Sequence, residues 1–245
     1  MIATLPMYDL PGVEAANDRY WASIAARLPG APAKLDRNAG TWSSWMSPEL
    51  IFSQTCGLPF KARLADKVTY IGTPDYGVPG CAPGWYTSVI IARRDEAAAL
   101  DTGRFAFNDP MSQSGWNAPA TLAAARGQTL NATLQSGSHM ESLRAVAEER
   151  AEFAAIDWVT WRIFEMTERV PAHVVVMEQT DPTPGLPYIA GGEANPLPLR
   201  RAVEEAIVAM DEDDRRLLQL QGLVQIPLED YLALPVPPPT KPKAL

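Results

Sequence analysis

The chain has 245 residues, of which 47% are hydrophobic and 20% are charged, a composition typical of a globular protein rather than a disordered or fibrous one. Its formal net charge of -8 argues against nucleic acid or an anionic membrane surface as a partner. No apolar run approaches the roughly 20 residues of a membrane span, so we expect no membrane insertion.

Short apolar runs, typical of β-strands, alternate along the chain with segments that have helical spacing. The expected strands are residues 2–7, 50–54, 68–72, 88–92, 104–108, 153–157, 173–179 and 186–190. The expected helices are residues 14–28, 118–126, 139–150, 160–168, 199–210 and 213–220. This alternation predicts an α/β fold with a mainly parallel sheet that helices cover on both faces.

The first candidate site is the turn NDPMSQSG, residues 108–115, between an expected strand and an expected helix. Ligands in such folds bind beyond the carboxyl ends of strands, where helix N-termini offer unpaired N–H groups. The hydroxyls of Ser112 and Ser114 at such a helix start favour an anion. A plain capping turn is the alternative interpretation.

Two further segments follow expected strands. In SGSHMES, Ser138 and Glu141 have the spacing of a capping box, and His139 stands in the first helical turn, where its ring could donate to an anion. Asp157 ends an apolar strand, where it could contact a ligand, or where Asp157 or Thr160 could cap the next helix. An Asp beside an anion accepts from a protonated ligand such as one with a P–OH group, and rejects fully ionised sulfate.

The aromatic residues and cysteines give weaker signals. Tyr8 and Tyr86 each stand at a strand terminus beside turn residues, and we expect both to face a cleft. Cys56 and Cys81 lie in Gly/Pro-rich turns, and the sequence leaves open whether they form a disulfide or stay as thiols. With two histidines, His139 and His173, and no metal-binding spacing, we expect no metal and no cofactor.

Three stretches, in this order, resemble the phosphate/phosphite/phosphonate substrate-binding proteins of ABC transporters: PGWYTSVIIARRD, FNDPMSQSG and GSHMESLRAVAEERAEFAAIDWVTW. The resemblance covers roughly residues 8–188. It implies the type II periplasmic-binding fold, a Venus flytrap with a mainly parallel sheet in each lobe and two crossovers between the lobes. The implied lobes are residues 1–86 plus 180–245 and residues 87–179. The Pro-rich composition of residues 234–245 predicts an extended or disordered tail, to which we assign no role in binding.

The resemblance also implies a binding site. The turn Ser112, Gln113, Ser114 and Gly115 would cradle an oxyanion, His139 would donate to it and Asp157 would face it. Tyr8 and Tyr86 would contribute from lobe one and the hinge region. Gln113 departs from a family turn that is usually richer in Ser and Thr, and its larger side chain could narrow or re-aim the pocket.

We therefore expect a solute-binding protein, not an enzyme, that closes around a small oxyanion such as phosphate, phosphite or a phosphonate. An ABC permease would be its partner, and a monomer is the default expectation. One alternative is a hydrolase with Cys56 as nucleophile, His139 as base and Asp157 as orienting group. Another is a sensor or interaction protein on the same fold. No secretion signal is visible, so the location is periplasmic if a leader has been removed or the chain is exported by another route, and cytoplasmic otherwise.

Overall fold

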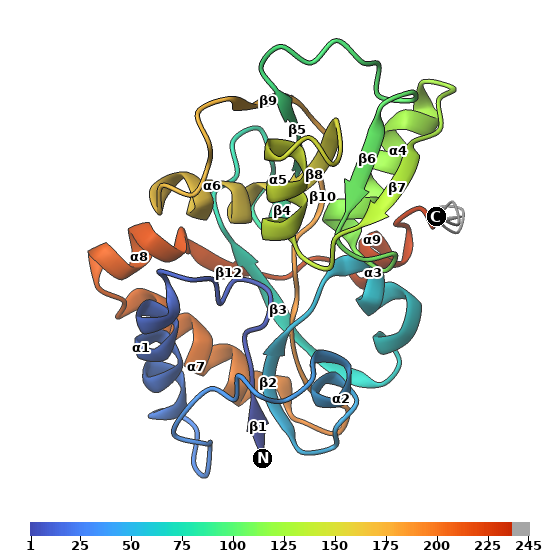
Figure 1. The fold of residues 1–245 in the computed structure, drawn as a ribbon. Helices are drawn as coiled ribbons and strands as arrows, with labels where there is room; N and C mark the ends of the chain where they lie inside the picture. Colours follow the sequence, from blue (N-terminus) through green and yellow to red (C-terminus); the bar gives the residue numbers. More distant parts are fainter. Residues whose placement is uncertain (237–245) are drawn as a thin grey trace. The chain divides into compact units, whose positions relative to one another are not determined.

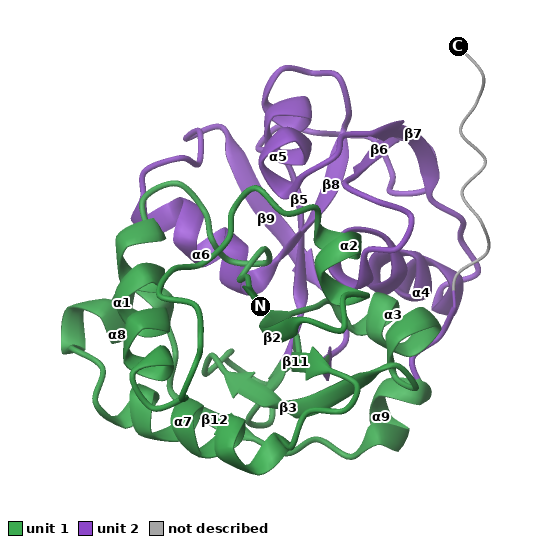
Figure 2. Cartoon of the chain, turned by 90° about the horizontal axis from the view of Figure 1, so that it is seen from below, with its two compact units in different colours: residues 1–85, 184–233 green, residues 86–183, 234–245 purple. Residues whose placement is uncertain are grey.

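The computed structural model describes residues 1–236, and these residues form two compact units. Unit 1 combines Met1–Trp85 with Pro184–Ala233, and unit 2 combines Tyr86–Thr183 with residues 234–236 (Figure 2). The boundaries expected from the sequence lie after residues 86 and 179, with the tail in lobe one. Of the expected Pro-rich tail, residues 237–245 lie outside the described part of the chain.

The sheet of unit 1 has five strands in the order β1-β2-β11-β3-β12. Their bounds are β1 Ile2–Ala3, β2 Leu50–Gln54, β11 Tyr188–Gly191, β3 Val68–Asp75 and β12 Gly222–Val224. β1 pairs with β2 in parallel, whereas β11 is antiparallel to both β2 and β3, and β12 is antiparallel to β3. β1, β2 and β3 therefore run in one direction, and β11 runs between them in the other.

Two groups of helices pack in unit 1. α1 Glu14–Ala25, α7 Pro196–Val208 and α8 Glu212–Leu218 lie together on one side of the sheet (Figure 1). Another group supplies Trp45, Phe60 and Tyr231 to a core built on Leu50 and Ile189. Its members are α2 Thr41–Trp45, α3 Gly57–Pro59, the π-helical turn η1 Phe60–Leu64 and α9 Leu228–Leu232.

The sheet of unit 2 has five strands in the order β7-β6-β8-β5-β9. Their bounds are β7 Asn131–Gln135, β6 Arg104–Phe107, β8 Phe153–Asp157, β5 Ser88–Arg93 and β9 Val174–Gln179. β7, β6 and β8 are parallel neighbours, and β5 is antiparallel to both β8 and β9. The helices are α4 Ala118–Ala125, α5 His139–Ala147 and α6 Trp158–Met166, with the π-helical turn η2 Gln113–Asn117 before α4.

The type II fold class is confirmed by the comparisons below, but the prediction of mainly parallel sheets is wrong. Both sheets are mixed, and the cause lies where the chain passes between the units. β5 follows the short strand β4 Trp85–Tyr86, and β11 follows the short strand β10 Thr183–Pro184. β4 and β10 pair with each other. No helix lies between β4 and β5 or between β10 and β11, so the helical return that makes neighbouring strands parallel is missing there. Among residues 1–236, no helix has both the length and the hydropathy that a membrane span requires.

Candidate functional site

The three segments that sequence analysis singled out lie at one edge of the unit 2 sheet. β6, β7 and β8 run in the same direction, and the helices that follow them are η2 with α4, α5 and α6 (Figure 1). The starts of these helices therefore share the carboxyl edge of the sheet, the usual position of ligand sites in α/β folds. The N-terminal end of β5 reaches the same edge, because Ser88 stands directly opposite Asp157 in the β5/β8 register.

The turn at residues 112–115 opens a π-helical turn. The Ser112 hydroxyl caps it and accepts a hydrogen bond from the Gly115 N–H at 2.9 Å. The Asn117 N–H donates to the Ser112 carbonyl oxygen at 3.0 Å, an i to i−5 bond. Such π turns are rare and occur often at functional sites. Ser112, Gln113 and Ser114 are all buried, so hydroxyls, an amide and helix-start N–H groups gather in a poorly hydrated place.

The structure brings Ser114 and His139 together. The Ser114 Oγ lies 3.0 Å from the Nε2 of His139, which is the first residue of α5. The Ser138 hydroxyl caps α5 and accepts from the Glu141 N–H at 3.1 Å. Only half of the predicted capping box is present, because the Glu141 carboxylate accepts a hydrogen bond from Arg144 instead.

His139 is held as a neutral ring near pH 7. Burial lowers the pKa of His139 to about 4, and the nearby Ala155 backbone partly opposes this effect. Its Nδ1 is buried and has no hydrogen-bond partner among residues 1–236. A neutral imidazole carries one N–H, and in this structure Ser114 occupies the contact with Nε2. The ring thus contributes a dipole and not a full positive charge.

Gly115 is required by the close approach of a neighbour. A Cβ at this position would lie 1.9 Å from the Asn108 Oδ1 and 3.3 Å from the His139 Cε1. Asn108, Gly115 and His139 therefore meet in a space that has no room for a methyl group. Asn108 had no assigned role in the sequence analysis, although its Oδ1 is buried without a hydrogen-bond partner among the described residues. Its place directly after β6 is the signal that could have identified it.

Asp157 caps the next helix. It is 2% exposed, and its Oδ1 accepts a hydrogen bond from the Thr160 N–H at 3.1 Å, so Asp157 is the capping residue of α6. Opposite it, Ser88 donates its N–H to the Thr180 hydroxyl at 2.9 Å. The Ser88 Oγ is buried and has no partner in the described part of the chain. Ser88, the first residue of β5, was not among the predicted site residues, although it stands two residues after Tyr86.

The two predicted tyrosines belong to different units. Tyr86 is buried in β4, where unit 2 begins. Tyr8 is buried in unit 1, and its ring lies edge-on to Tyr76 with 5.1 Å between the centroids. Gln54, the last residue of β2, donates to the Tyr76 hydroxyl at 3.1 Å. Gln54 and Tyr76 thus stand at the ends of β2 and β3, beside Tyr8 in unit 1.

The two cysteines form no disulfide, so the bridge that the sequence left open is absent. Cys56 is buried at the start of α3, and burial raises the pKa of the Cys81 thiol. Cys56 belongs to unit 1, whereas His139 and Asp157 belong to unit 2. The His139 Nε2, the atom that would act as the base, hydrogen-bonds with the Ser114 Oγ at 3.0 Å.

Comparison with known proteins gives a family and a fold. The family model for the periplasmic substrate-binding protein of phosphonate ABC transporters matches residues 60–231, well over half of the chain. None of the curated proteins matches the chain.

Several solved structures share the fold. PhnD1 from Prochlorococcus marinus in complex with methylphosphonate is 14% identical, with a TM-score of 0.67, and the match covers 94% of this chain and 93% of that one. A binding-protein component of an ABC phosphonate transporter from Pseudomonas aeruginosa is 16% identical, with a TM-score of 0.69 and coverage of 95% and 82%. A Xanthomonas citri protein bound to ATP is 14% identical, with a TM-score of 0.62 and coverage of 95% and 94%. At such identities the likeness shows the fold alone.

Proposed function

Because the chain belongs to the family of periplasmic substrate-binding proteins of phosphonate ABC transporters, we propose that it binds a small phosphorus oxyanion, either phosphate, phosphite or a phosphonate. In this proposal it delivers the ligand to an ABC permease, acts in the periplasm as a monomer and catalyses no reaction. The methylphosphonate in the Prochlorococcus marinus structure is a ligand of this chemical class.

The observation that carries the proposal is the meeting of Ser114 and His139 beside the start of η2, which continues directly into α4. Helix-start N–H groups and hydroxyls are suited to an oxyanion, because they present partial positive charge without a counterion of their own. In the proposed site, Ser112, Gln113, Ser114 and Gly115 surround the anion. His139 orients the Ser114 hydroxyl.

Asp157 gives the proposed site its selectivity. Its carboxylate stands at the same sheet edge as η2, and it accepts one hydrogen bond from the Thr160 N–H. A phosphorus oxyanion that keeps one proton can donate to this carboxylate, whereas sulfate is fully ionised near pH 7 and is repelled.

Closure of the two units around the ligand is the proposed mechanism. Tyr8 from unit 1 and Tyr86 at the start of unit 2 then complete the contacts made by the η2 turn. Binding selects the closed state, and the permease recognises that state.

A thermal-shift panel tests the proposal. Phosphate, phosphite, methylphosphonate and aminoethylphosphonate are compared with sulfate, followed by calorimetry on each ligand that stabilises the protein. A ligand present at 100 times its Kd adds about 2.7 kcal/mol to the free energy of unfolding. For a protein of this size, that free energy raises Tm by about 5–10 °C. A flat response to all four phosphorus compounds contradicts the proposal.

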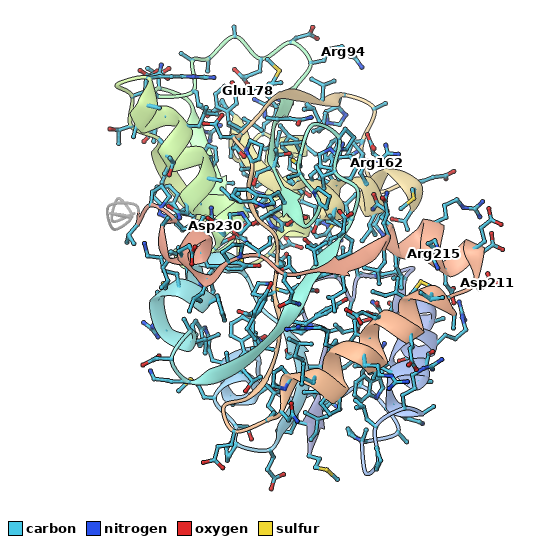
Figure 3. All side chains as sticks on the ribbon, turned by 180° about the vertical axis from the view of Figure 1, so that it is seen from behind. Arg94, Arg162, Glu178, Asp211, Arg215 and Asp230 are labelled. Carbon is cyan, nitrogen blue, oxygen red and sulfur yellow. The ribbon has the colours of Figure 1, made fainter. Side chains whose placement is uncertain are left out.

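Asp157→Asn should weaken the rejection of sulfate while it leaves folding intact, because Asn caps a helix as well as Asp does. The matched control is Asp211→Asn at the start of α8 (Figure 3), where the Oδ1 of Asp211 accepts from the Asp213 N–H at 2.9 Å. Calorimetry with phosphite and with sulfate measures the ratio of the sulfate Kd to the phosphite Kd. We expect this ratio to fall about tenfold in Asp157→Asn, the loss of one charge-selective contact, and to stay unchanged in the control. A ratio that Asp157→Asn leaves unchanged places selectivity elsewhere.

A further inference from the structure

The C-terminal segment at residues 234–236 is bonded to the turn that we propose as the oxyanion site. Asn117, the last residue of η2, is 0% exposed. Its Nδ2 donates to the Gln113 Oε1 at 2.8 Å and to the Pro235 carbonyl oxygen at 2.6 Å. Both N–H bonds of this amide are thus used, one inside the turn and one on a segment 118 residues further along the chain. A single side chain therefore joins the turn to the end of the described chain.

The same residue closes the π-helical backbone. The Asn117 N–H bonds to the Ser112 carbonyl oxygen at 3.0 Å, and its own carbonyl oxygen accepts from the Thr121 hydroxyl at 2.8 Å. A π turn is less favourable than a regular helix and persists where surrounding contacts hold it. Asn117 makes contacts of this kind. It bonds to Ser112 and Gln113 inside the turn and to Thr121 and Pro235 outside it, so it links the π turn to its surroundings.

The bond to Asn117 also sets the direction of Gln113. The Gln113 side chain is 1% exposed, and its Oε1 is held toward Asn117, which fixes the plane of the carboxamide. Without the Pro235 carbonyl oxygen, the buried Asn117 amide would have an unpaired N–H, and it would regain a partner only if it turned. Such a turn breaks the bond to Gln113 and frees a side chain of the turn that we propose as the oxyanion site.

We propose that Asn117 and residues 234–236 position the oxyanion-binding turn, so that the affinity for the ligand depends on a segment that does not touch it. Asn117 is a positioning residue in this scheme, and Pro235 supplies the carbonyl oxygen that holds it. The inference rests on the proposed function, since it assumes that the η2 turn contacts the ligand.

Two truncations and one substitution test the scheme. The first truncation ends the chain after Val236 and keeps the Pro235 carbonyl oxygen, and the second ends it after Ala233 and removes that acceptor. Calorimetry with phosphite and methylphosphonate should show an unchanged Kd for the first and a Kd about tenfold higher for the second, the effect of one hydrogen bond. Asn117→Ala should weaken binding at least as much, and the second truncation should add nothing in the Asn117→Ala background.

Amide hydrogen exchange of the ligand-free protein gives a readout that does not depend on any ligand. The amides of residues 113–117 should exchange faster in the shorter truncation and in Asn117→Ala, whereas those of α6 in the same unit should not change. If no phosphorus compound binds the full chain, the proposed function fails while the exchange data still test the positioning. Equal exchange rates and equal Kd values in the full chain and in all the variants overturn the inference. It is also overturned if the losses of affinity from the shorter truncation and from Asn117→Ala add when the two are combined.

Discussion

Acid should destabilise the folded protein through His139, and the size of the effect follows from its burial. The pKa of His139 is about 4 in the folded chain and has an ordinary value of 6.5 when unfolded. Above pH 6.5 the ring is neutral in both states and stability does not depend on it. As the pH falls from 6.5 to 4, the unfolded chain binds a proton that the folded chain does not, so the free energy of unfolding falls. Below pH 4 both states are protonated and the loss stops.

At about 1.4 kcal/mol per pKa unit, the difference between 6.5 and about 4 corresponds to a loss of roughly 3 kcal/mol. This is an upper value, because His139 as a whole residue is only partly buried, although its Nδ1 is buried. Urea unfolding at several pH values between 7 and 4 measures the loss, with His139→Gln and His173→Gln compared with the unaltered chain.

His139→Gln should lose stability less steeply than the unaltered chain over this range, because glutamine does not titrate. His173, which is exposed, serves as the control, and His173→Gln should keep the original slope. Parallel curves for His139→Gln and the unaltered chain would refute the reasoning, and so would an NMR titration that places the pKa of the His139 ring near 6.5.

Two further changes test the packing around the site and the core of unit 1. Gly115→Ala should lower the free energy of unfolding by about 1–3 kcal/mol, because its Cβ would lie 1.9 Å from the Asn108 Oδ1. Thermal denaturation should show that adding Asn108→Ala recovers part of this loss, and no recovery would mean that the strain lies elsewhere. Tyr231→Phe keeps the ring 5.1 Å from Phe60 but removes a buried hydroxyl that bonds to the Thr73 Oγ1 at 2.6 Å and to the Gly185 carbonyl oxygen at 2.8 Å. We expect a cost of about 1–3 kcal/mol in the same assay, and an unchanged Tm would contradict this expectation.

The apolar runs of the sequence predicted most strands well, because buried strands leave a strong local signal. Residues 50–54 and 153–157 form strands with the predicted bounds. Five-residue helices such as α2 and α9 were not predicted, since they are too short to show a 3.6-residue period. The direction of β5 and β11 could not be predicted either, because it depends on where the chain passes between the units and not on local composition.

From the order of the strands, only the meeting of the three site segments could be predicted. Parallel strands end at a common edge, so the segments that contain Ser114, His139 and Asp157 could be expected to meet. The side-chain contacts that shape the site could not be predicted in this way, because they join residues far apart in the sequence. Asn117 and Pro235 are 118 residues apart, and nothing in the sequence QSGWN distinguishes a π turn from an α turn. Such contacts depend on which side chains the finished fold brings within reach.

The charge of the proposed site limits which form of the ligand it can hold. The chain carries a net charge of -8, and the residues proposed to contact the ligand include no Lys or Arg. His139 is neutral near pH 7 because of its lowered pKa, so it adds no positive charge. Attraction for an anion must then come from the partial positive charges of N–H groups and hydroxyls at the start of η2. A ligand that keeps one proton also donates to Asp157, which lowers the repulsion between the two negative groups. Affinity should therefore follow the population of the monoanion, and it should fall as pH rises through the second ionisation of the ligand.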